Sequence, residues 1–248
     1  MKVLALRAAV LAGLLAVWQI VAAGRNPVLY VAPSAIPGAL LRVLSVEDLP
    51  PLPEHLWLTL QEIAAAYALA VSTGLWLGFV LGLQKSLGRI YEPILAALYA
   101  IPSVVWYPSL MLFFGLGPTS KIAFGFLLGF FPIVLSVLAG VRQVDRHLIT
   151  VATSMGAGPW AIFRKVVVPG MASTLASGLR TGLALSVVGV LVGEVLGARS
   201  GVGYVLNYVY GLLRTPEYVA LVIIVGAVVL VIDGAAGVFE ARAKRWAG

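Results

Sequence analysis

The sequence predicts an all-α integral membrane protein with about six transmembrane helices. The chain has 248 residues, of which 61% are hydrophobic and only 11% are charged, and its mean hydropathy is +1.02. A soluble domain has about a quarter charged residues, and a single globular core cannot bury this much apolar surface. Its apolar residues also gather in runs of about 20, which is the length that a helix needs to cross a bilayer.

Six apolar runs are long enough to be spans. They lie at roughly 3–23, 57–83, 90–115, 119–140, 171–196 and 218–240. The second and third contain Gly or Pro, which membrane helices tolerate where neighbouring groups satisfy the backbone. The first run also resembles a signal peptide, because Lys2 and Arg7 flank an apolar centre and Val21-Ala22-Ala23 precedes Gly24. Cleavage there is an open alternative that leaves the other five spans unchanged.

The basic residues predict the orientation of these spans. With the N-terminus in the cytoplasm, the inside segments hold eleven of them: Lys2, Arg7, Lys85, Arg89, Arg142, Arg146, Arg164, Lys165, Arg242, Lys244 and Arg245. The outside segments hold five: Arg25, Arg42, Lys121, Arg199 and Arg214. Because basic residues concentrate on the cytoplasmic side of membrane proteins, we expect both termini inside. The net charge of +7 is therefore an orienting bias and does not indicate nucleic-acid binding.

Three parts follow from this topology. Residues 1–56 form the first transmembrane helix and a Pro-rich outer segment, in which 36–44 is predicted to be a short amphipathic helix at the membrane interface. Residues 57–240 form a five-helix core that includes a cytoplasmic loop at 141–170, and residues 241–248 form a cytoplasmic basic tail.

The stretch "VATSMGAGPWAIFRKVVVPG" (151–170) is too patterned to be a simple turn. Asp145 is a good N-cap for a helix, and Gly156 stands where a glycine ends a helix in the left-handed conformation. Gly158-Pro159 restarts the chain, since proline suits a first helical position, and Pro169 is expected to close the unit. An apolar stripe of Trp160, Phe163 and Val167 lies between them. The sequence predicts two short helices joined by a glycine turn at the cytoplasmic surface.

This stretch resembles the cytoplasmic loop of permeases from binding-protein-dependent ABC importers, whose pattern is E-A-A-x3-G-x9-I-x-L-P. Gly156 is followed by nine residues and then by Val166-Val167-Val168-Pro169, so the spacing matches. Ala152 takes the second Ala position, whereas Thr150 replaces the Glu. The resemblance implies that the loop docks on an ATPase through Thr150, Ala152, Gly156, Ala157, Gly158, Trp160, Phe163, Val166, Val168 and Pro169.

Further segments are similar to the nitrate/sulfonate/taurine-type branch of these permeases. They are "IPSVVWYPSLMLFFGLGPTSK" (101–121), "GFFP" (129–132), "GLRTGLALS" (178–186) and "GEVLGARSGVGYVL" (193–206). Two positions depart from the branch: Pro118 stands where an acidic residue is common, and Gly193 stands where Ala usually precedes the Glu.

The resemblance implies a type I ABC importer permease fold in a bacterial or archaeal cytoplasmic membrane. It also implies two partner ATPase subunits that bind ATP and Mg, a second permease copy, and an external substrate-binding protein that selects the substrate. Sulfonates, taurine, nitrate and small heterocyclic or aromatic compounds all stay open as substrates. We expect no cofactor in this chain and no catalytic role for it.

Three alternatives stay open. A secondary transporter or channel would need no ATPase, and the chain itself carries no G-x-x-x-x-G-K-[ST] nucleotide-binding run. A membrane-embedded enzyme lacks its usual motifs here, since there is no H-E-x-x-H or G-x-S-x-G. The chain has only two histidines, which lie far apart, and no cysteine, so no residues show the spacing of metal ligands. In the third alternative, the patterned loop at 151–170 is an amphipathic hairpin that lies on the lipid surface.

Ionisable residues inside spans are costly and mark interior or pathway positions. Glu62, Arg180, Glu194 and Asp233 are such residues. Arg180 and Asp233 lie at similar predicted depths, so they form a structural ion pair or else contribute to the pathway. Glu194, in the outer third of its span like Glu62, either lines an outer gate or hydrogen-bonds a broken helix end.

Proline and glycine mark special positions in the spans. Pro102 and Pro108 are predicted to kink the third span, either as a packing accommodation or as a gating hinge. Gly74 and Gly78, like Gly178 and Gly182, are spaced for close helix packing.

Overall fold

The chain forms a helical bundle in a computed structural model that describes residues 2–26, 28–45 and 49–247. Within these described ranges, five helices are long and apolar enough to cross a membrane. They are α1 (Lys2–Ala22), α3 (Leu52–Leu83), α6 (Pro118–Gln143), α10 (Ala172–Gly197) and α12 (Thr215–Ala247). Each coincides with one of the apolar runs, and α3 starts five residues earlier than predicted because Pro53 and Glu54 suit its first turn.

The remaining predicted span is broken. It consists of α4 (Lys85–Ala100), the short 3-10 helix η2 (Ser103–Trp106) and α5 (Tyr107–Phe114), and its two halves are bent by 85°. Ile101 is extended before Pro102, as a residue before proline prefers, so the predicted kink at Pro102 is confirmed. The kink predicted at Pro108 is wrong. Pro108 lies in the first turn of α5, where a proline costs no backbone hydrogen bond.

Helix α6 is the centre of the bundle and packs most extensively against α10 and α3. Small residues allow this contact: a Cβ on Gly78 would lie 2.6 Å from Cβ of Val137, and one on Gly182 would lie 2.5 Å from Cγ1 of Ile133. Such distances are too short for any side chain, so the predicted close packing at the glycine pairs is confirmed.

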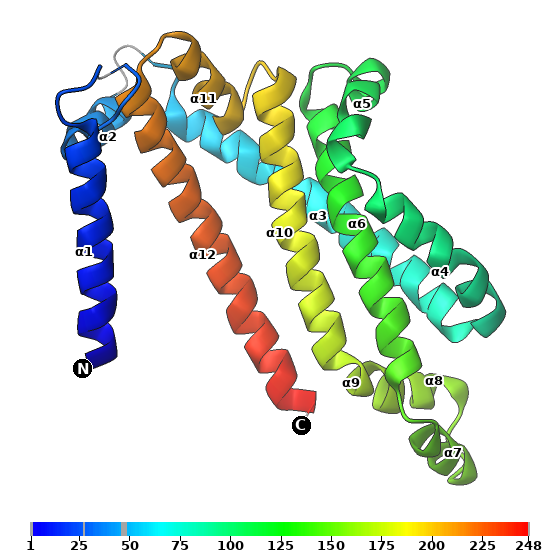
Figure 1. The fold of residues 1–248 in the computed structure, drawn as a ribbon. Coiled ribbons are helices and arrows are strands. Elements are labelled where there is room, and N and C mark those ends of the chain that lie inside the picture. The colour runs from blue at the N-terminus through cyan, green and yellow to red at the C-terminus, as the bar shows by residue number, and fades with distance from the viewer. Residues whose placement is uncertain (1, 27, 46–48, 248) are drawn as a thin grey trace.

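The outer segment packs onto the core at one end of the bundle. Helix α2 (Ile36–Leu44) has the bounds that the sequence predicted. Its buried Ala39 and Val43 join a cluster with residues of α11 (Val202–Gly211) and α12. Helix α1 stands apart from the other long helices (Figure 1), and most of its described side chains are exposed. A hydrogen bond of 3.2 Å from Gln19 Nε2 to Ser34 Oγ links it to the outer segment.

The two ends of the bundle differ in what they carry. Both termini lie at the same end as α7 (Arg146–Ser154), α8 (Pro159–Ile162) and α9 (Val168–Gly170), whereas α2, α5 and α11 lie at the opposite end (Figure 1). The predicted basic tail continues α12 to Ala247. Three of the basic residues assigned to the cytoplasmic side have side chains that are not among those that the structure describes: Lys2, Lys244 and Arg245.

Candidate functional site: a helical loop and two polar clusters

The patterned loop begins with a capped helix and a glycine turn. Asp145 is the N-cap of α7, and its side chain accepts a hydrogen bond of 2.8 Å from the backbone N–H of His147. At the other end Gly156 has φ +79°. Its N–H donates to the carbonyl of Thr153 (2.9 Å), and the N–H of Ala157 donates to the carbonyl of Ala152 (3.0 Å). These two bonds form a Schellman motif, which requires a left-handed residue at this place. The prediction for Gly156 is confirmed.

The second helix of the loop starts as predicted but does not end as predicted. Pro159 opens α8, and the chain then continues as a π-helix from Phe163 to Val167 and into α9. The N–H of Val168 bonds to the carbonyl of Phe163 across this wider turn. Pro169 therefore does not close the unit, and this prediction is wrong. It lies in the first turn of α9, where a missing N–H costs little.

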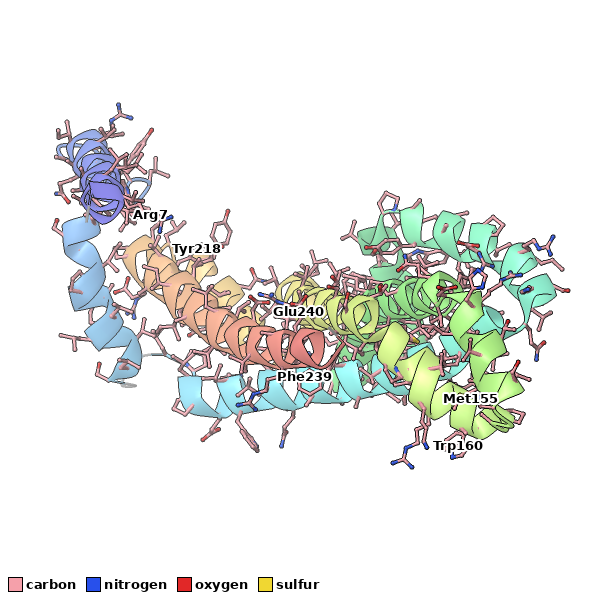
Figure 2. All side chains as sticks on the ribbon, turned by 90° about the horizontal axis from the view of Figure 1, so that it is seen from below. Arg7, Met155, Trp160, Tyr218, Phe239 and Glu240 are labelled. Atoms are coloured by element: carbon pink, nitrogen blue, oxygen red, sulfur yellow. The ribbon has the colours of Figure 1, made fainter. Side chains whose placement is uncertain are left out.

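The loop is anchored on one face and exposed on the other. Val167 is buried, and Ile149 and Phe163 pack against the same cluster as residues of α3 and α6. Trp160 is 71% exposed and Met155 is 81% exposed, and both lie at the margin of this end of the molecule (Figure 2). A cavity of about 330 Å³ lies between α7 and the helical segment that ends in α9. Ala152, Val166 and Pro169 are among the residues that line it. The structure thus places these motif residues together on an accessible surface.

The remaining loop residues have simpler surroundings. Thr150, which replaces the Glu of the pattern, is exposed and donates a hydrogen bond of 3.0 Å to the carbonyl of Arg146 within its own helix. Gly158 is the N-cap of α8 and has extended backbone angles. Val168 belongs to the helical continuation and is half-buried.

A buried ion pair joins α3 and α6 toward the opposite end. The ammonium of Lys121 lies 2.9 Å from Oε1 of Glu62, and neither side chain is more than 2% exposed. Lys121 Nζ also donates to the carbonyl of Ser200 at 3.3 Å. The prediction that Lys121 is one of the outer surface charges is wrong, because its side chain is fully buried. The side chain is buried because α6 begins at Pro118 and turns Lys121 toward α3.

Next to this pair, three side chains cap the start of α11. The N–H of Gly201 donates to Nδ1 of His55 (3.0 Å), that of Val202 to Oγ1 of Thr59 (2.9 Å) and that of Gly203 to Oε2 of Glu194 (2.8 Å). The first N–H groups of a helix have no partner within the helix, so these contacts satisfy donors that would otherwise be unpaired. Thr59 in turn donates to Oε1 of Glu194 at 2.6 Å.

Two glycines make this cap possible. Gly201 has φ +96°, and a Cβ there would lie 2.1 Å from Oε1 of Glu194. A Cβ on Gly203 would lie 2.5 Å from Cβ of Glu194. Of the two arrangements proposed for Glu194, the structure shows the hydrogen bonds to a helix end. A role for Glu194 or Glu62 at an outer gate remains a prediction.

The third polar group joins α10 and α12. Arg180 forms a two-pronged contact with Asp233, with Nε at 3.0 Å from Oδ1 and Nη2 at 2.7 Å from Oδ2. Its Nη1 also donates to Oε2 of Glu240 at 2.9 Å, and Ser177 donates to the other oxygen of Glu240. The pairing of Arg180 with Asp233 is as the sequence predicted, but the sequence analysis missed Glu240.

An apolar cavity of about 730 Å³ borders this group between α3, α10 and α12. Tyr67 and Arg180 are among the residues that line it. The other two pathway candidates, Pro108 and Pro102, are both exposed. Pro108 lies in the first turn of α5, and Pro102 lies at the break of the third span. The structure does not bring it together with Arg180 or Glu62. The candidate pathway residues thus belong to three separate places in the fold.

Comparisons with known proteins agree with this architecture. Residues 70–245 match the family described as "Binding-protein-dependent transport system inner membrane component". A protein of Methanocaldococcus jannaschii named as an ABC transporter permease is 30% identical over 177 residues, which cover 71% of this chain and 66% of the relative. The taurine transport system permease protein TauC of Escherichia coli is 28% identical over 195 residues, or 79% of this chain and 71% of TauC. The fold is similar to a solved chain from the MetNI methionine ABC transporter in an inward-facing conformation. That match has a TM-score of 0.65 and 23% identity, over 77% of this chain and 95% of the other.

Proposed function

Because this chain belongs to the inner membrane components of binding-protein-dependent transport systems, we propose that it forms the substrate pathway of an ATP-driven importer. The chain is a multi-pass membrane protein with the all-helical fold of a type I importer permease. In this proposal it hydrolyses no ATP itself. A partner ATPase binds ATP and Mg, and an external binding protein delivers the substrate.

The observation that carries the proposal is the geometry of the loop from α7 to α9, which we call the coupling loop (residues 145–170). It is anchored by Val167 and Phe163 in the core, between α6 and α10. It also presents Met155 and Trp160 to the outside. A partner that moves the exposed part of the loop, around Met155 and Trp160, therefore also moves the ends of α6 and α10. Coupling of ATP binding to transport requires such a connection.

We also propose an orientation, a partner copy and a substrate class. The basic residues favour the coupling loop and both termini in the cytoplasm, which is the side on which an ATPase finds ATP. Pairing with a second identical chain follows from the resemblance to the nitrate/sulfonate/taurine branch. The same resemblance, together with the similarity to a taurine permease, supports a small anion such as taurine, another sulfonate or nitrate as the substrate.

Gly156 and Gly158 offer a matched test of the coupling loop. A Cβ on either glycine would meet no atom within 4 Å, but Gly156 has φ +79° and Gly158 has φ −70°. A left-handed conformation costs an alanine about 1–2 kcal/mol and costs a β-branched valine more. We expect Gly156→Ala to weaken ATPase docking about fivefold to thirtyfold, Gly156→Val to abolish it, and Gly158→Ala to leave it nearly unchanged.

The measurements are the amount of each variant in the membrane, the ATPase that co-purifies with it, and ATP hydrolysis stimulated by taurine-loaded binding protein. All variants should reach the membrane at similar levels, because the glycines lie outside the spans. A Gly156→Val variant that retains and stimulates the ATPase like the wild type would show that this loop is not the coupling element.

A further inference from the structure

An apolar cavity of about 900 Å³ lies beside the coupling loop, and this loop is at the end of the bundle that carries the termini (Figure 1). One wall is a single face of α3, formed by Trp76, Phe79 and Leu83, which recur at helical spacing. The other wall contains Trp160 and Phe163 of the loop. The lining is almost entirely apolar, and Trp76 and Trp160 are both largely exposed.

A second cavity of about 370 Å³ adjoins the first and is basic. Four cationic side chains line it: Lys85, Arg89, Arg142 and Arg146. Arg142 is paired with Glu92. Lys85, Arg89 and Arg146 form no ion pair with any carboxylate among the described residues. The two cavities share Leu83, Ile149 and Val167 as lining residues, so they meet at the end of α3.

Their arrangement along α3 matches the cytoplasmic half of a bilayer. Trp76 precedes the end of α3 at Leu83 by seven residues, which at 1.5 Å per residue is about 10 Å along the helix axis. The apolar cavity thus extends from the level of the basic side chains into the region of the lipid chains. A ligand that fills both cavities needs an anionic head and an apolar tail that are covalently joined.

We propose that these two adjoining cavities bind an anionic phospholipid of the cytoplasmic leaflet. Its acyl chain lies along Trp76 and Phe79 of α3, and its phosphate lies against Arg89 and Arg146. Anionic lipids are concentrated in that leaflet, and basic pockets between helices at this level are where their headgroups bind. The lipid bridges α3 and the coupling loop, so its occupancy ties the position of the loop to the charge of the membrane. This inference goes beyond the proposed transport function and requires only that the chain is inserted in a membrane.

The test is native mass spectrometry of the purified full chain in detergent, titrated with phosphatidylglycerol or phosphatidylcholine. We expect the wild type to retain phosphatidylglycerol in preference to phosphatidylcholine. Each basic residue near a membrane surface contributes about a fivefold change in affinity for anionic lipid. The double variant Arg89→Gln/Arg146→Gln is therefore expected to bind phosphatidylglycerol about 25-fold more weakly while its weak binding of phosphatidylcholine is unchanged.

The matched control is Arg7→Gln/Arg199→Gln, which removes the same charge from exposed positions outside both cavities. Arg7 lies on α1, across the molecule from Trp160 (Figure 2). This control should bind phosphatidylglycerol like the wild type, and Phe79→Gln should weaken both lipids. An equal loss in the control would show that only net charge attracts the lipid. No preference for phosphatidylglycerol in the wild type would show that the cavities do not select an anionic headgroup, and either result would overturn the proposal.

Two competitors separate the other possible occupants. If sn-glycerol 3-phosphate displaces the lipid as well as phosphatidylglycerol does, the site recognises a free anion and the proposal is wrong. If a purified partner ATPase releases the lipid, the apolar wall belongs to the ATPase interface and the proposal is equally wrong. The binding assay itself contains no ATPase, so its result is independent of whether the proposed transport function is correct.

Discussion

Arg180 shows how a single residue in a span is accommodated. Its guanidinium contacts two acids that lie seven residues apart on α12, Asp233 and Glu240. That spacing places both acids on one face of the helix, two turns apart. Ser177 donates a further hydrogen bond to Glu240, so both α10 and α12 contribute to the group.

This arrangement predicts an order of effects for substitutions in α10 and α12. Arg180→Gln should destabilise the protein most, because Asp233 and Glu240, which face one another across the guanidinium, both lose their contact with it. Asp233→Asn should be milder, because Arg180 keeps Glu240. The double variant Arg180→Gln/Asp233→Asn should lose less than the sum of the two single changes, since it also removes one of the facing carboxylates. The measurement is the midpoint of thermal unfolding of the purified chain in one detergent, and strict additivity would contradict the coupling.

The residues that the sequence analysis missed have partners far away in the chain. Glu62 and Lys121 were each visible in the sequence, but their pairing depends on the contact between α3 and α6. Lys121 was placed outside because it follows the predicted start of a span by only two residues. Glu240 had a local signal, since it follows Asp233 by two helical turns, but it stood at the predicted end of its span. By contrast, Gly156 and Asp145 act on backbone groups within three residues, so sequence alone was enough to assign them.

At the scale of elements, α11 is held by side chains from two neighbouring helices. His55 and Thr59 of α3 and Glu194 of α10 accept the hydrogen bonds of its first three N–H groups. The run "GEVLGARSGVGYVL" shows the carboxylate and the glycines of this cap. His55 and Thr59, however, lie about 140 residues earlier in the chain (separations of 146 and 143). No local pattern predicts them.

Thr59 allows a test of this cap. Thr59→Val keeps the shape of the side chain but removes the acceptor for the N–H of Val202 and the donor to Glu194. Loss of a capping hydrogen bond costs about 1 kcal/mol, so amide hydrogen exchange at the start of α11 should become about fivefold faster. Thr59→Ser retains the hydroxyl and should exchange like the wild type. Equal exchange in the Val and Ser variants would show that the hydroxyl does not hold α11.

Some helix boundaries depend on neighbouring residues, whereas others depend on packing against distant parts of the chain. The bounds of α2, the N-cap of α7 and the restart at Pro159 were predictable, because each depends on neighbouring residues. The continuation past Pro169 was not predictable. It requires a π-helical turn that buries Val167 against the core. Only the packed structure shows that Val168 stays helical before the proline, so that the chain continues to Gly170.

At the scale of the whole molecule, the two ends of the bundle are chemically different. One end carries both termini and the coupling loop, and the other carries α2, α5 and α11 (Figure 1). Burial of Lys121 beside Glu62 removes it from the five basic residues assigned to the outside and leaves four. The eleven basic residues assigned to the inside therefore outnumber the outer ones by more than the sequence alone indicated, which strengthens the predicted orientation.

Cysteine labelling tests this orientation without background, because the chain contains no cysteine. Gly158 and Arg199 are both exposed. Gly158 lies between α7 and α8 and Arg199 between α10 and α11, so they lie at opposite ends of the bundle (Figure 1). In intact cells we expect an impermeant maleimide to label Arg199→Cys but not Gly158→Cys, whereas a permeant maleimide labels both. After the cells are opened, the impermeant reagent should also reach Gly158→Cys, which shows that its thiol is accessible. The opposite pattern in intact cells would put the coupling loop outside. An ATPase supplied with cytoplasmic ATP could then not dock on it, and the proposed mechanism would fail together with the orientation.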